Sequence, residues 1–248
     1  MKSLSFPFAV VAVPLVLAVV TGCTSLPGRA GASSAKLTAG WKQISFTNEV
    51  QHPYDLKLSD RYHYNRWTDT HDFWVYYTDK PHAPPPNRTT ARTEMRLQTY
   101  HTGEHMFDAD LNISPGTFAC IAQVFDAAHG PVTMLIAHPD GTVTAGRTLI
   151  ATNAIGRWWN LKMSNNPVAG GKIRIYANNV LVATFDNRGP RDYYFKCGVY
   201  SRHNSARSEV RYRHIKMWIR DSSAPSKMAG PREAAGDGGR ITMMTSVR

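Results

Sequence analysis

Residues 193–200 have the sequence Tyr-Tyr-Phe-Lys-Cys-Gly-Val-Tyr, and this stretch decides the fold. Its aromatic and β-branched residues predict a β-strand. Successive side chains on a strand point to opposite faces. One face is therefore apolar and expected in a core: Phe195, Cys197 and Val199. The other presents Lys196, Gly198 and Tyr200, where the glycine is expected to let a ligand approach the backbone.

Similar short runs surround this stretch from about residue 41 to 220. Gly, Pro, Asn and Asp separate roughly a dozen of them, and helical periodicity is not evident. The clearest runs are 71–78, 92–99, 106–113, 117–126, 132–137, 157–163, 172–177 and 180–186. Asn178-Asn179 between the last two tolerates the positive φ of a tight hairpin. The pattern predicts an all-β sandwich or jelly roll of two antiparallel sheets, with a concave face able to hold an extended polymer.

Two further runs carry polar residues on one face, as the predicted strand at residues 193–200 does. In Arg92-Thr93-Glu94-Met95-Arg96, the charged residues alternate with Thr and Met. In Cys120-Ile121-Ala122-Gln123-Val124-Phe125, alternation places Ile121 and Phe125 beside Gln123. A row of Arg, Gln, Lys and Tyr is unusual for a merely solvated sheet face, which more often mixes Thr, Ser, Lys and Glu.

The charge balance favours an anionic partner. The formal net charge is +11, which suits nucleic acid, anionic lipid or an acidic polysaccharide. Charge alone does not choose among these three. The N-terminus does, because it predicts export, and export argues against nucleic acid as the partner.

The N-terminal residues predict a lipid anchor. Lys2 precedes an apolar run over residues 6–20, which is short for a membrane span and typical of a signal peptide. The run ends in Val-Thr-Gly-Cys, and this resembles the lipobox of bacterial lipoproteins, implying cleavage before Cys23 and its acylation. Thr24 resembles the pattern sent to an outer membrane, so we expect the protein there or on the periplasmic face. The alternatives are a plain secretory signal and a small core helix.

The expected organisation follows from these boundaries. Residues 1–22 are a lipoprotein signal peptide and 23–40 a flexible tether rich in Ser, Gly and Ala. Residues 41–220 form the β domain, and 221–248 form a disordered tail. Cys120 and Cys197 remain in the domain, either as a disulfide, which an exported compartment permits, or as two free buried thiols.

The motifs resemble the alginate lyases of polysaccharide lyase family 7 and, more loosely, the glucuronan lyases. The family pattern Arg-Ser/Thr-Glu-hydrophobic-Arg matches residues 92–96, and Tyr-Phe-Lys-x-Gly-Val-Tyr matches residues 194–200, with Gln123 between them in chain order. The resemblance covers about residues 41–220. It implies a concanavalin A-like jelly roll whose concave cleft binds an acidic polysaccharide, with no cofactor, acting as a monomer.

One position departs from the family pattern. The family has Gln-Ile/Val-His where this chain has Gln123-Val124-Phe125, so the histidine that the resemblance would make the base is missing. His82, in the Pro-rich loop before residue 92, is our first candidate for the base, and His203 is the second. For either histidine taken alone, an ordinary loop or surface position is the favoured alternative.

The resemblance implies β-elimination of a uronic acid polymer. Arg92 and Gln123 would neutralise the sugar carboxylate. Tyr200 would protonate the leaving oxygen, and it also serves as the base if nearby cations stabilise its phenolate. The remaining polar residues are expected to bind substrate: Glu94, Arg96 and Lys196. Glu94 lies between two arginines, which makes it a weak base and a better orienting group.

The sequence also suggests other assignments for a motif and for the function. A second Arg-Ser-Glu-Val-Arg run at residues 207–211 comes too late in the chain for the family motif and is expected to be a closing strand. A non-catalytic jelly-roll lipoprotein that binds carbohydrate is the main alternative, favoured by Phe125. A glycosidase would need two carboxylates flanking the bond, and the predicted cleft offers only Glu94. No His, Asp and Glu residues have the spacing of a metal site.

Overall fold

The structure is a computed structural model that describes residues 37–202 and 206–220. The predicted signal peptide, Cys23, most of the tether, His203 and the predicted tail lie outside the described residues. Nothing in the described part of the chain is a helix long and apolar enough to cross a membrane.

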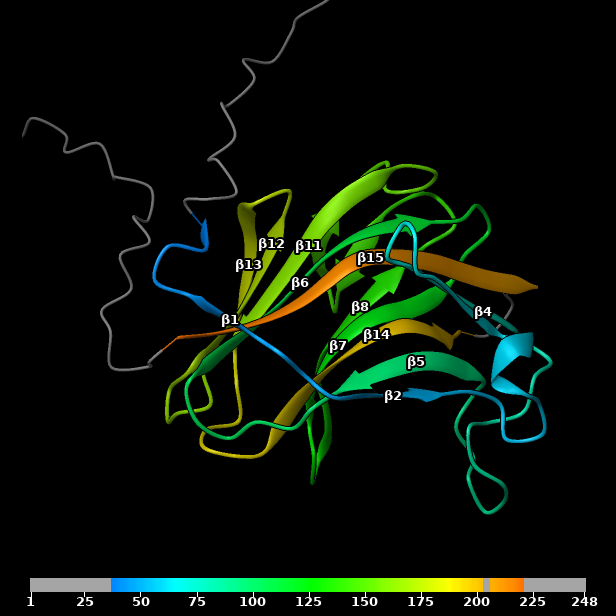
Figure 1. The fold of residues 1–248 in the computed structure, drawn as a ribbon, viewed down its shortest axis with the longest axis horizontal. Coiled ribbons are helices and arrows are strands. Elements are labelled where there is room, and N and C mark those ends of the chain that lie inside the picture. Colours follow the sequence, from blue (N-terminus) through cyan, green and yellow to red (C-terminus); the bar gives the residue numbers. More distant parts are fainter. Residues whose placement is uncertain (1–36, 203–205, 221–248) are drawn as a thin grey trace, which may run out of the picture. The chain divides into compact units, whose positions relative to one another are not determined.

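Two antiparallel sheets form the domain, as the sequence predicts (Figure 1). One sheet has the order β13 (Val180–Asp186), β12 (Lys172–Ala177), β11 (Trp158–Asn165), β6 (Glu104–Ile113), β15 (Arg207–Arg220), β4 (Thr70–Tyr76) and β3 (Tyr62–Asn65), with β1 (Lys42–Ile44) paired to β15. The other has the order β10 (Thr148–Ala151), β9 (Val143–Ala145), β8 (Gly130–Ala137), β7 (Ala119–Asp126), β14 (Tyr193–Ser201), β5 (Arg92–Leu97) and β2 (Asn48–Gln51). A short 3-10 helix, η1, spans Leu58–Asp60.

The core lies between the two sheets. Its β14 contribution is the apolar set expected from alternation: Phe195, Cys197 and Val199. Phe107 of β6 and Tyr212 of β15 face them from the other sheet, and Tyr212 donates a 2.6 Å hydrogen bond to the Ile121 carbonyl of β7. Burying each large apolar side chain contributes roughly 1.5–3 kcal/mol, so the alternation of β14 fixes which of its faces is left for chemistry.

The predicted strands are present, and two of them have the predicted bounds. β12 and β13 flank Asn178 and Asn179, whose φ values of 49° and 66° make the tight turn. The expected closing strand at residues 207–211 is the start of β15, which continues to Arg220. Prediction missed the short strands β1, β2, β3, β9 and β10, which have three or four residues each. Such strands are too short to show alternation.

A β-bulge corrects two details of the predicted alternation. The pairing of β14 with β7 shifts between Cys197 and Tyr200, so that Cys120 lies opposite Tyr200 and Ile121 enters the core. Gly198, at φ +131°, does not leave room for a ligand. A Cβ there would lie 2.4 Å from the Thr93 carbonyl oxygen and 3.3 Å from the core residue Phe73. The glycine is therefore needed for the close approach of β5 to β14.

Both cysteines of the domain are free and buried. Cys197 lies in the core, and burial raises the pKa of both thiols. Of the two possibilities that the sequence left open, the structure has the pair of buried thiols.

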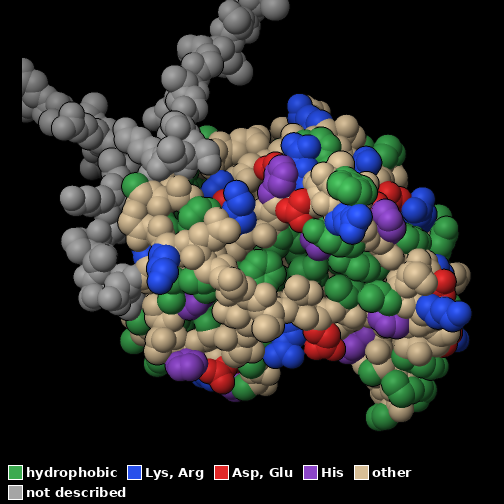
Figure 2. Space-filling view, viewed as in Figure 1, with side chains coloured by type: hydrophobic (Ala, Val, Ile, Leu, Met, Phe, Trp, Pro, Cys, Tyr) green, Lys and Arg blue, Asp and Glu red, His purple; other side chains and the backbone are tan. Residues whose placement is uncertain are grey.

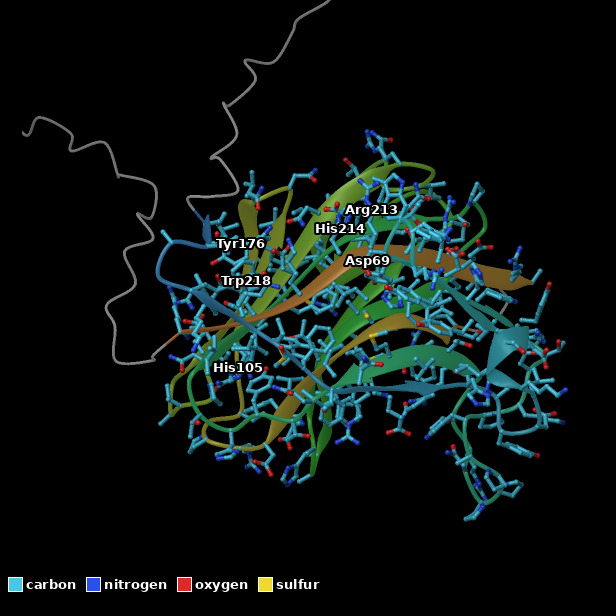
Figure 3. All side chains as sticks on the ribbon, viewed as in Figure 1. Asp69, His105, Tyr176, Arg213, His214 and Trp218 are labelled. Atoms are coloured by element: carbon cyan, nitrogen blue, oxygen red, sulfur yellow. The ribbon has the colours of Figure 1, made fainter. Side chains whose placement is uncertain are left out.

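The outer face of the eight-stranded sheet carries its own polar residues. Asp69, Arg213 and His214 lie close together where β4 and β15 meet (Figure 3). The His214 N–H donates to the Asp69 carbonyl, and Arg213 pairs with Asp110 at 3.3 Å. Farther along, the Trp218 indole N–H donates to Asp108. These contacts cross neighbouring strands and hold the sheet in register.

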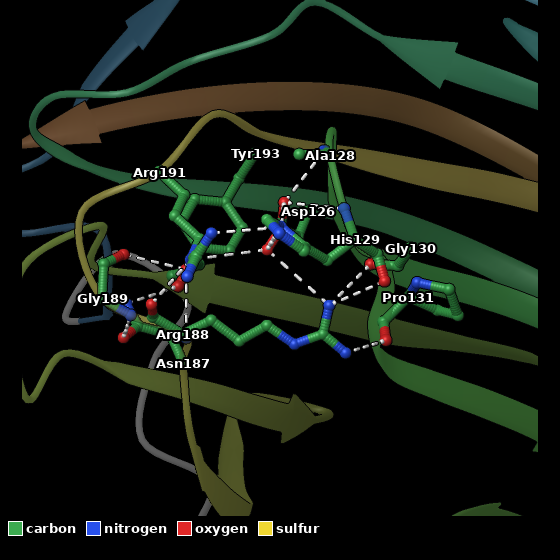
Figure 4. A network of polar contacts seen from close by, with 11 residues as sticks. Asp126, Ala128, His129, Gly130, Pro131, Asn187, Arg188, Gly189, Arg191 and Tyr193 are labelled. Carbon is green, nitrogen blue, oxygen red and sulfur yellow. Dashed lines mark hydrogen bonds and ion pairs between the residues drawn. The ribbon is translucent and has the colours of Figure 1, made fainter.

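A polar clamp fastens the ends of β7 and β14 (Figure 4). The Asp126 carboxylate is 1% exposed and accepts hydrogen bonds from the backbone N–H groups of Ala128 and His129. Arg188 and Arg191 each approach it at 3.7 Å. Burial alone would raise the pKa of Asp126, but these hydrogen bonds outweigh it and the pKa is lowered. The clamp therefore fixes the loop after β13 against the turn after β7.

Gly198→Ala tests the role of the bulge. We expect a loss of about 3 kcal/mol in the free energy of unfolding, because the variant combines backbone strain with a clash against β5. Gly116→Ala is the matched control, since Gly116 also has a positive φ, +78°, but nothing lies within 4 Å of an added Cβ. We expect it to lose only about 1 kcal/mol. Equal losses in urea unfolding would contradict the packing argument.

Candidate active site

The three motif strands are neighbours in the seven-stranded sheet, with β14 between β7 and β5. The register places Lys196 beside Gln123 on one side and Arg96 on the other. Tyr200 lies beside Arg92. The residues that the sequence predicted to share a groove therefore share one sheet face.

A chain of polar contacts runs under this face. Glu94 accepts hydrogen bonds from the Gln123 side-chain amide and from Lys196 Nζ, the latter at 3.2 Å. Lys196 Nζ also donates to Gln51 Oε1 of β2 at 2.7 Å. Burial lowers the pKa of Lys196, and the Glu94 carboxylate opposes that effect. Because bonds between buried charged groups are strong and costly to break, the chain holds four strands in register.

Arg92 lies at the end of this chain, against Tyr200. Its guanidinium carbon is 4.1 Å from the centroid of the Tyr200 ring, and its Nη1 is 3.6 Å from Glu94 Oε2. Arg92 is 7% exposed, and its Nε is buried without a hydrogen-bond partner in the described structure. A buried donor without a partner is uncommon, so this guanidinium has capacity left for an anionic ligand.

His82 is close enough to feel the same charges. It lies in the loop of residues 77–91, which joins β4 to β5 and projects beside the sheet (Figure 1). Burial lowers the pKa of His82, and the positive charges of Arg92 and Lys196 lower it further, while Glu94 and Glu49 oppose them. Its Nδ1 is buried and lacks a partner within the described residues. The imidazole is therefore neutral near pH 7 and able to accept a proton.

The surface is hollowed between this loop and the body of the domain. Figure 2 shows the projecting hydrophobic tip of the loop at the lower edge and, across the hollow, basic, acidic and histidine side chains.

Phe125 and Tyr194 form an aromatic pair at the other end of the face. Their rings are stacked, with centroids 4.9 Å apart. The Arg96 guanidinium lies 4.3 Å from the Tyr194 ring centroid, and Lys196 Nζ lies 5.4 Å from that of Phe125. Where the family pattern has a histidine, this chain therefore has an apolar surface with cations around it.

The structure revises the expected contacts of three predicted residues. Glu94 and Lys196 are 1% and 2% exposed and bonded to each other, and Gln123 is as buried as Lys196, so all three form the floor of the face. Arg96 donates to Thr99 Oγ1 instead of pairing with Glu94. Sequence reasoning missed Gln51 altogether, because nothing in the four-residue strand β2 marks it as the partner of a lysine 145 positions away.

No group of three or more His, Cys, Asp or Glu side chains within residues 37–202 and 206–220 is arranged to hold a metal ion.

Comparison with known proteins shows the family of the chain. The model of the alginate lyase family matches residues 43–223. The citrate-binding protein of Hevea brasiliensis is 28% identical over 198 residues, which is 76% of this chain and 82% of that protein.

Solved structures with this fold include two alginate lyases. The enzyme from Corynebacterium sp. gives a TM-score of 0.53 at 17% identity, covering 73% of this chain and 94% of its own. The enzyme from Pseudomonas aeruginosa gives 0.54 at 16% identity, covering 70% and 98%. These likenesses show the jelly-roll fold. Because the family match spans well over half of the 248 residues, the chain belongs to the alginate lyase family and is a polysaccharide lyase.

Proposed function

We propose that this lyase cleaves a uronic acid polymer such as alginate or glucuronan by β-elimination, with Arg92, Gln123, Tyr200 and His82 as its catalytic residues. The observation that carries the proposal is that Arg92, Gln123 and Tyr200 lie on three adjacent strands, beside two buried nitrogens that lack partners, Arg92 Nε and His82 Nδ1. A sugar carboxylate and the hydrogen next to it would supply partners for both.

Charge neutralisation is the first requirement of the reaction. The hydrogen beside the carboxylate is not acidic while that group keeps its charge, because removing it places a second negative charge alongside. Arg92 supplies a charge-assisted hydrogen bond, and the second N–H of the Gln123 amide supplies a neutral one. A preorganised donor of this kind contributes about 3–4 kcal/mol at a developing anion.

Glu94 and Lys196 act as positioning residues in this scheme. The Glu94 carboxylate takes one N–H of Gln123 and one of Lys196, which fixes the rotamer of the amide. It also lies near Arg92. Because the charges of Glu94 and Lys196 are buried, Arg92 and Gln123 are held in place before substrate arrives. This preorganisation is what makes them effective donors.

Proton transfer falls to the two groups above this floor. His82 removes the hydrogen, for which its lowered pKa is favourable because the neutral imidazole is the form that accepts a proton. Tyr200 protonates the departing 4-oxygen, and the product gains a C=C bond next to its carboxylate. If His82 does not perform the role of base, the phenolate form of Tyr200 removes the hydrogen and then returns that proton to the departing 4-oxygen.

Phe125 stands where the family pattern has a histidine, and we assign its aromatic pair with Tyr194 a role in substrate binding instead of catalysis. Phe125, half-buried beside the buried Tyr194, offers an apolar face to a neighbouring sugar ring, and Arg96, which lies over Tyr194, would meet the carboxylate of that sugar. The polymer would thus be held on both sides of the bond that breaks.

Export as a lipoprotein is part of the proposal. It is supported by the apolar run at residues 6–20 and by the lipobox-like residues ending at Cys23. Such an anchor would hold the enzyme on the outer membrane or periplasmic face, where a polysaccharide can reach it. If Cys23 is acylated, the full chain partitions into a detergent phase and Cys23→Ser does not.

Tyr200→Phe tests the proton donor. We expect formation of unsaturated product, followed by its ultraviolet absorbance on alginate and on glucuronan, to fall by at least about 10²-fold, because general acid catalysis is lost. Polymer binding should persist, since Arg92 and Gln123 remain. Undiminished turnover would remove Tyr200 from the mechanism. If the wild-type chain binds polymer but forms no product, the result would support the carbohydrate-binding alternative. The name of the Hevea relative, citrate-binding protein, describes a protein that binds a carboxylate.

His82→Gln tests the base. We expect turnover to fall by about 10²- to 10⁴-fold. In the wild-type chain, the acid limb of the rate profile should lie below pH 6.5, because a lowered pKa keeps His82 neutral to lower pH. The limb should vanish in the variant. His101→Gln is the control, an exposed histidine whose ion-pair neighbour is Asp192. An unchanged profile in His82→Gln would pass the role to Tyr200.

A further inference from the structure

The polar face of β14 continues beyond Tyr200 to an arginine. The backbone N–H of Arg202 donates to the Phe118 carbonyl at 3.1 Å, so the pairing of β14 with the chain before β7 extends past Ser201. Ser201 is 3% exposed, whereas Arg202 is exposed. Because side chains alternate along an extended strand, Arg202 projects on the same side of the sheet as Tyr200.

A second observation places the charge of Arg202 near the catalytic face. Cys120 of β7 is paired with Tyr200 in the register. Burial and the Glu94 carboxylate raise the pKa of the Cys120 thiol, and the charges of Lys196 and Arg202 are among the effects that oppose them. The guanidinium is therefore close enough to the floor of the face to act on a group beside Tyr200.

The Arg202 guanidinium has no partner in the described part of the chain. Within residues 37–202 and 206–220 it makes neither an ion pair nor a hydrogen bond, whereas Arg92 lies 3.6 Å from Glu94. An exposed arginine without a partner is common, so exposure alone points to no ligand. The position of this arginine, two residues beyond the proposed proton donor, is what makes its free N–H donors significant, because a guanidinium matches the geometry of a carboxylate.

Three arginines follow one another along the face. Arg96 and Arg92 lie four positions apart on β5, and Arg202 lies two positions beyond the residue that pairs with Arg92. At about 3.3 Å per residue, the three positions span roughly 20 Å in the direction of the strands. Every sugar of a polyuronate carries one carboxylate, so a chain with one carboxylate at Arg92 presents another on either side. Arg96 is assigned one of these, and Arg202 lies toward the other.

We propose that Arg202 binds the carboxylate of a sugar next to the reacting one, and that the enzyme thereby selects polymers whose uronates follow one another without neutral sugars between them. The proposal rests on the proposed function, which places the reacting carboxylate at Arg92. Arg202 meets substrate away from the bond that breaks, so its interaction is the same before and during the reaction. Interactions of that kind lower KM and leave kcat unchanged.

Direct binding is tested by calorimetry with glucuronan and alginate tetrasaccharides, in the Tyr200→Phe chain because its turnover is slow. We expect added Arg202→Ala to raise the dissociation constant about 5- to 10-fold, and added Arg66→Ala to leave it within about twofold. Arg66 is the matched control, an exposed arginine in the turn between β3 and β4. Equal affinities of the two double variants, or no binding of either tetrasaccharide to the Tyr200→Phe chain, would overturn the proposal.

Charge and selection have their own readouts. The loss caused by Arg202→Ala should shrink as sodium chloride is added, because salt screens an exposed ion pair. A hyaluronan tetrasaccharide, in which uronates alternate with neutral sugars, should bind the Tyr200→Phe chain at least about 5-fold more weakly than the tighter of the two polyuronate tetrasaccharides. A loss that is independent of salt would rule out the ion pair, and equal affinity for the alternating sugar would rule out the selection.

Turnover separates this proposal from the function on which it rests. With Tyr200 intact, Arg202→Ala should raise the KM for polyuronate about 5- to 10-fold and leave kcat within about twofold. A fall in kcat at unchanged KM would contradict the binding role. If the wild-type chain cleaves no polyuronate, the proposed function fails, and the titrations still decide whether Arg202 binds a uronate.

Discussion

The buried contact between Glu94 and Lys196 is the constraint on which the catalytic face depends. Taking two charges out of water is costly, and the cost is offset only if each finds partners of good geometry. Here Glu94 is served by Gln123 and Lys196, and Lys196 is served in turn by Gln51. These partners belong to β7, β14, β5 and β2, so the charges can be satisfied only when all four strands are in register. The same strand register is therefore needed for the fold and for the positions of the proposed donors.

The same requirement explains why only some polar residues remain free for a ligand. Gln123 and Lys196 spend hydrogen bonds on Glu94, and Lys196 is buried in doing so. Arg92 reaches Glu94 only at 3.6 Å and keeps an unpaired Nε. A row of four polar side chains that looks uniform in sequence is thus divided by hydrogen bonding more than by burial, since Gln123 and Lys196 are both 2% exposed. Lys196 is committed to its buried partners, whereas Arg92 and the half-buried Tyr200 are the groups proposed to meet substrate.

The sequence could predict the strands of the site because their alternation is long enough to read. In β14, the core set and Tyr200 follow directly from a period of two, and the motif order fixed the partners of that strand. Alternation failed at Ile121, because a bulge between β7 and β14 changes the face on which the residues of β7 lie. The space expected for a ligand at Gly198 is absent, because β5 packs closely against that residue. Gln51 could not be found, since its role comes from a tertiary contact. The burial of Glu94 and Lys196 was equally invisible, because polarity in sequence does not reveal depth.

The replacement of the family histidine by Phe125 moves the proposed base from a strand to a loop, and the loop has the anchors to hold it. Tyr54 donates its N–H to the Pro81 carbonyl at 3.0 Å, immediately before His82. At the far end, Thr90 Oγ1 donates to the Ser201 carbonyl of β14 at 2.7 Å. Since the loop also joins β4 of one sheet to β5 of the other, the imidazole is placed by the packing of the whole sandwich. The other proposed catalytic groups need only the register of one sheet, whereas the proposed base needs both sheets together.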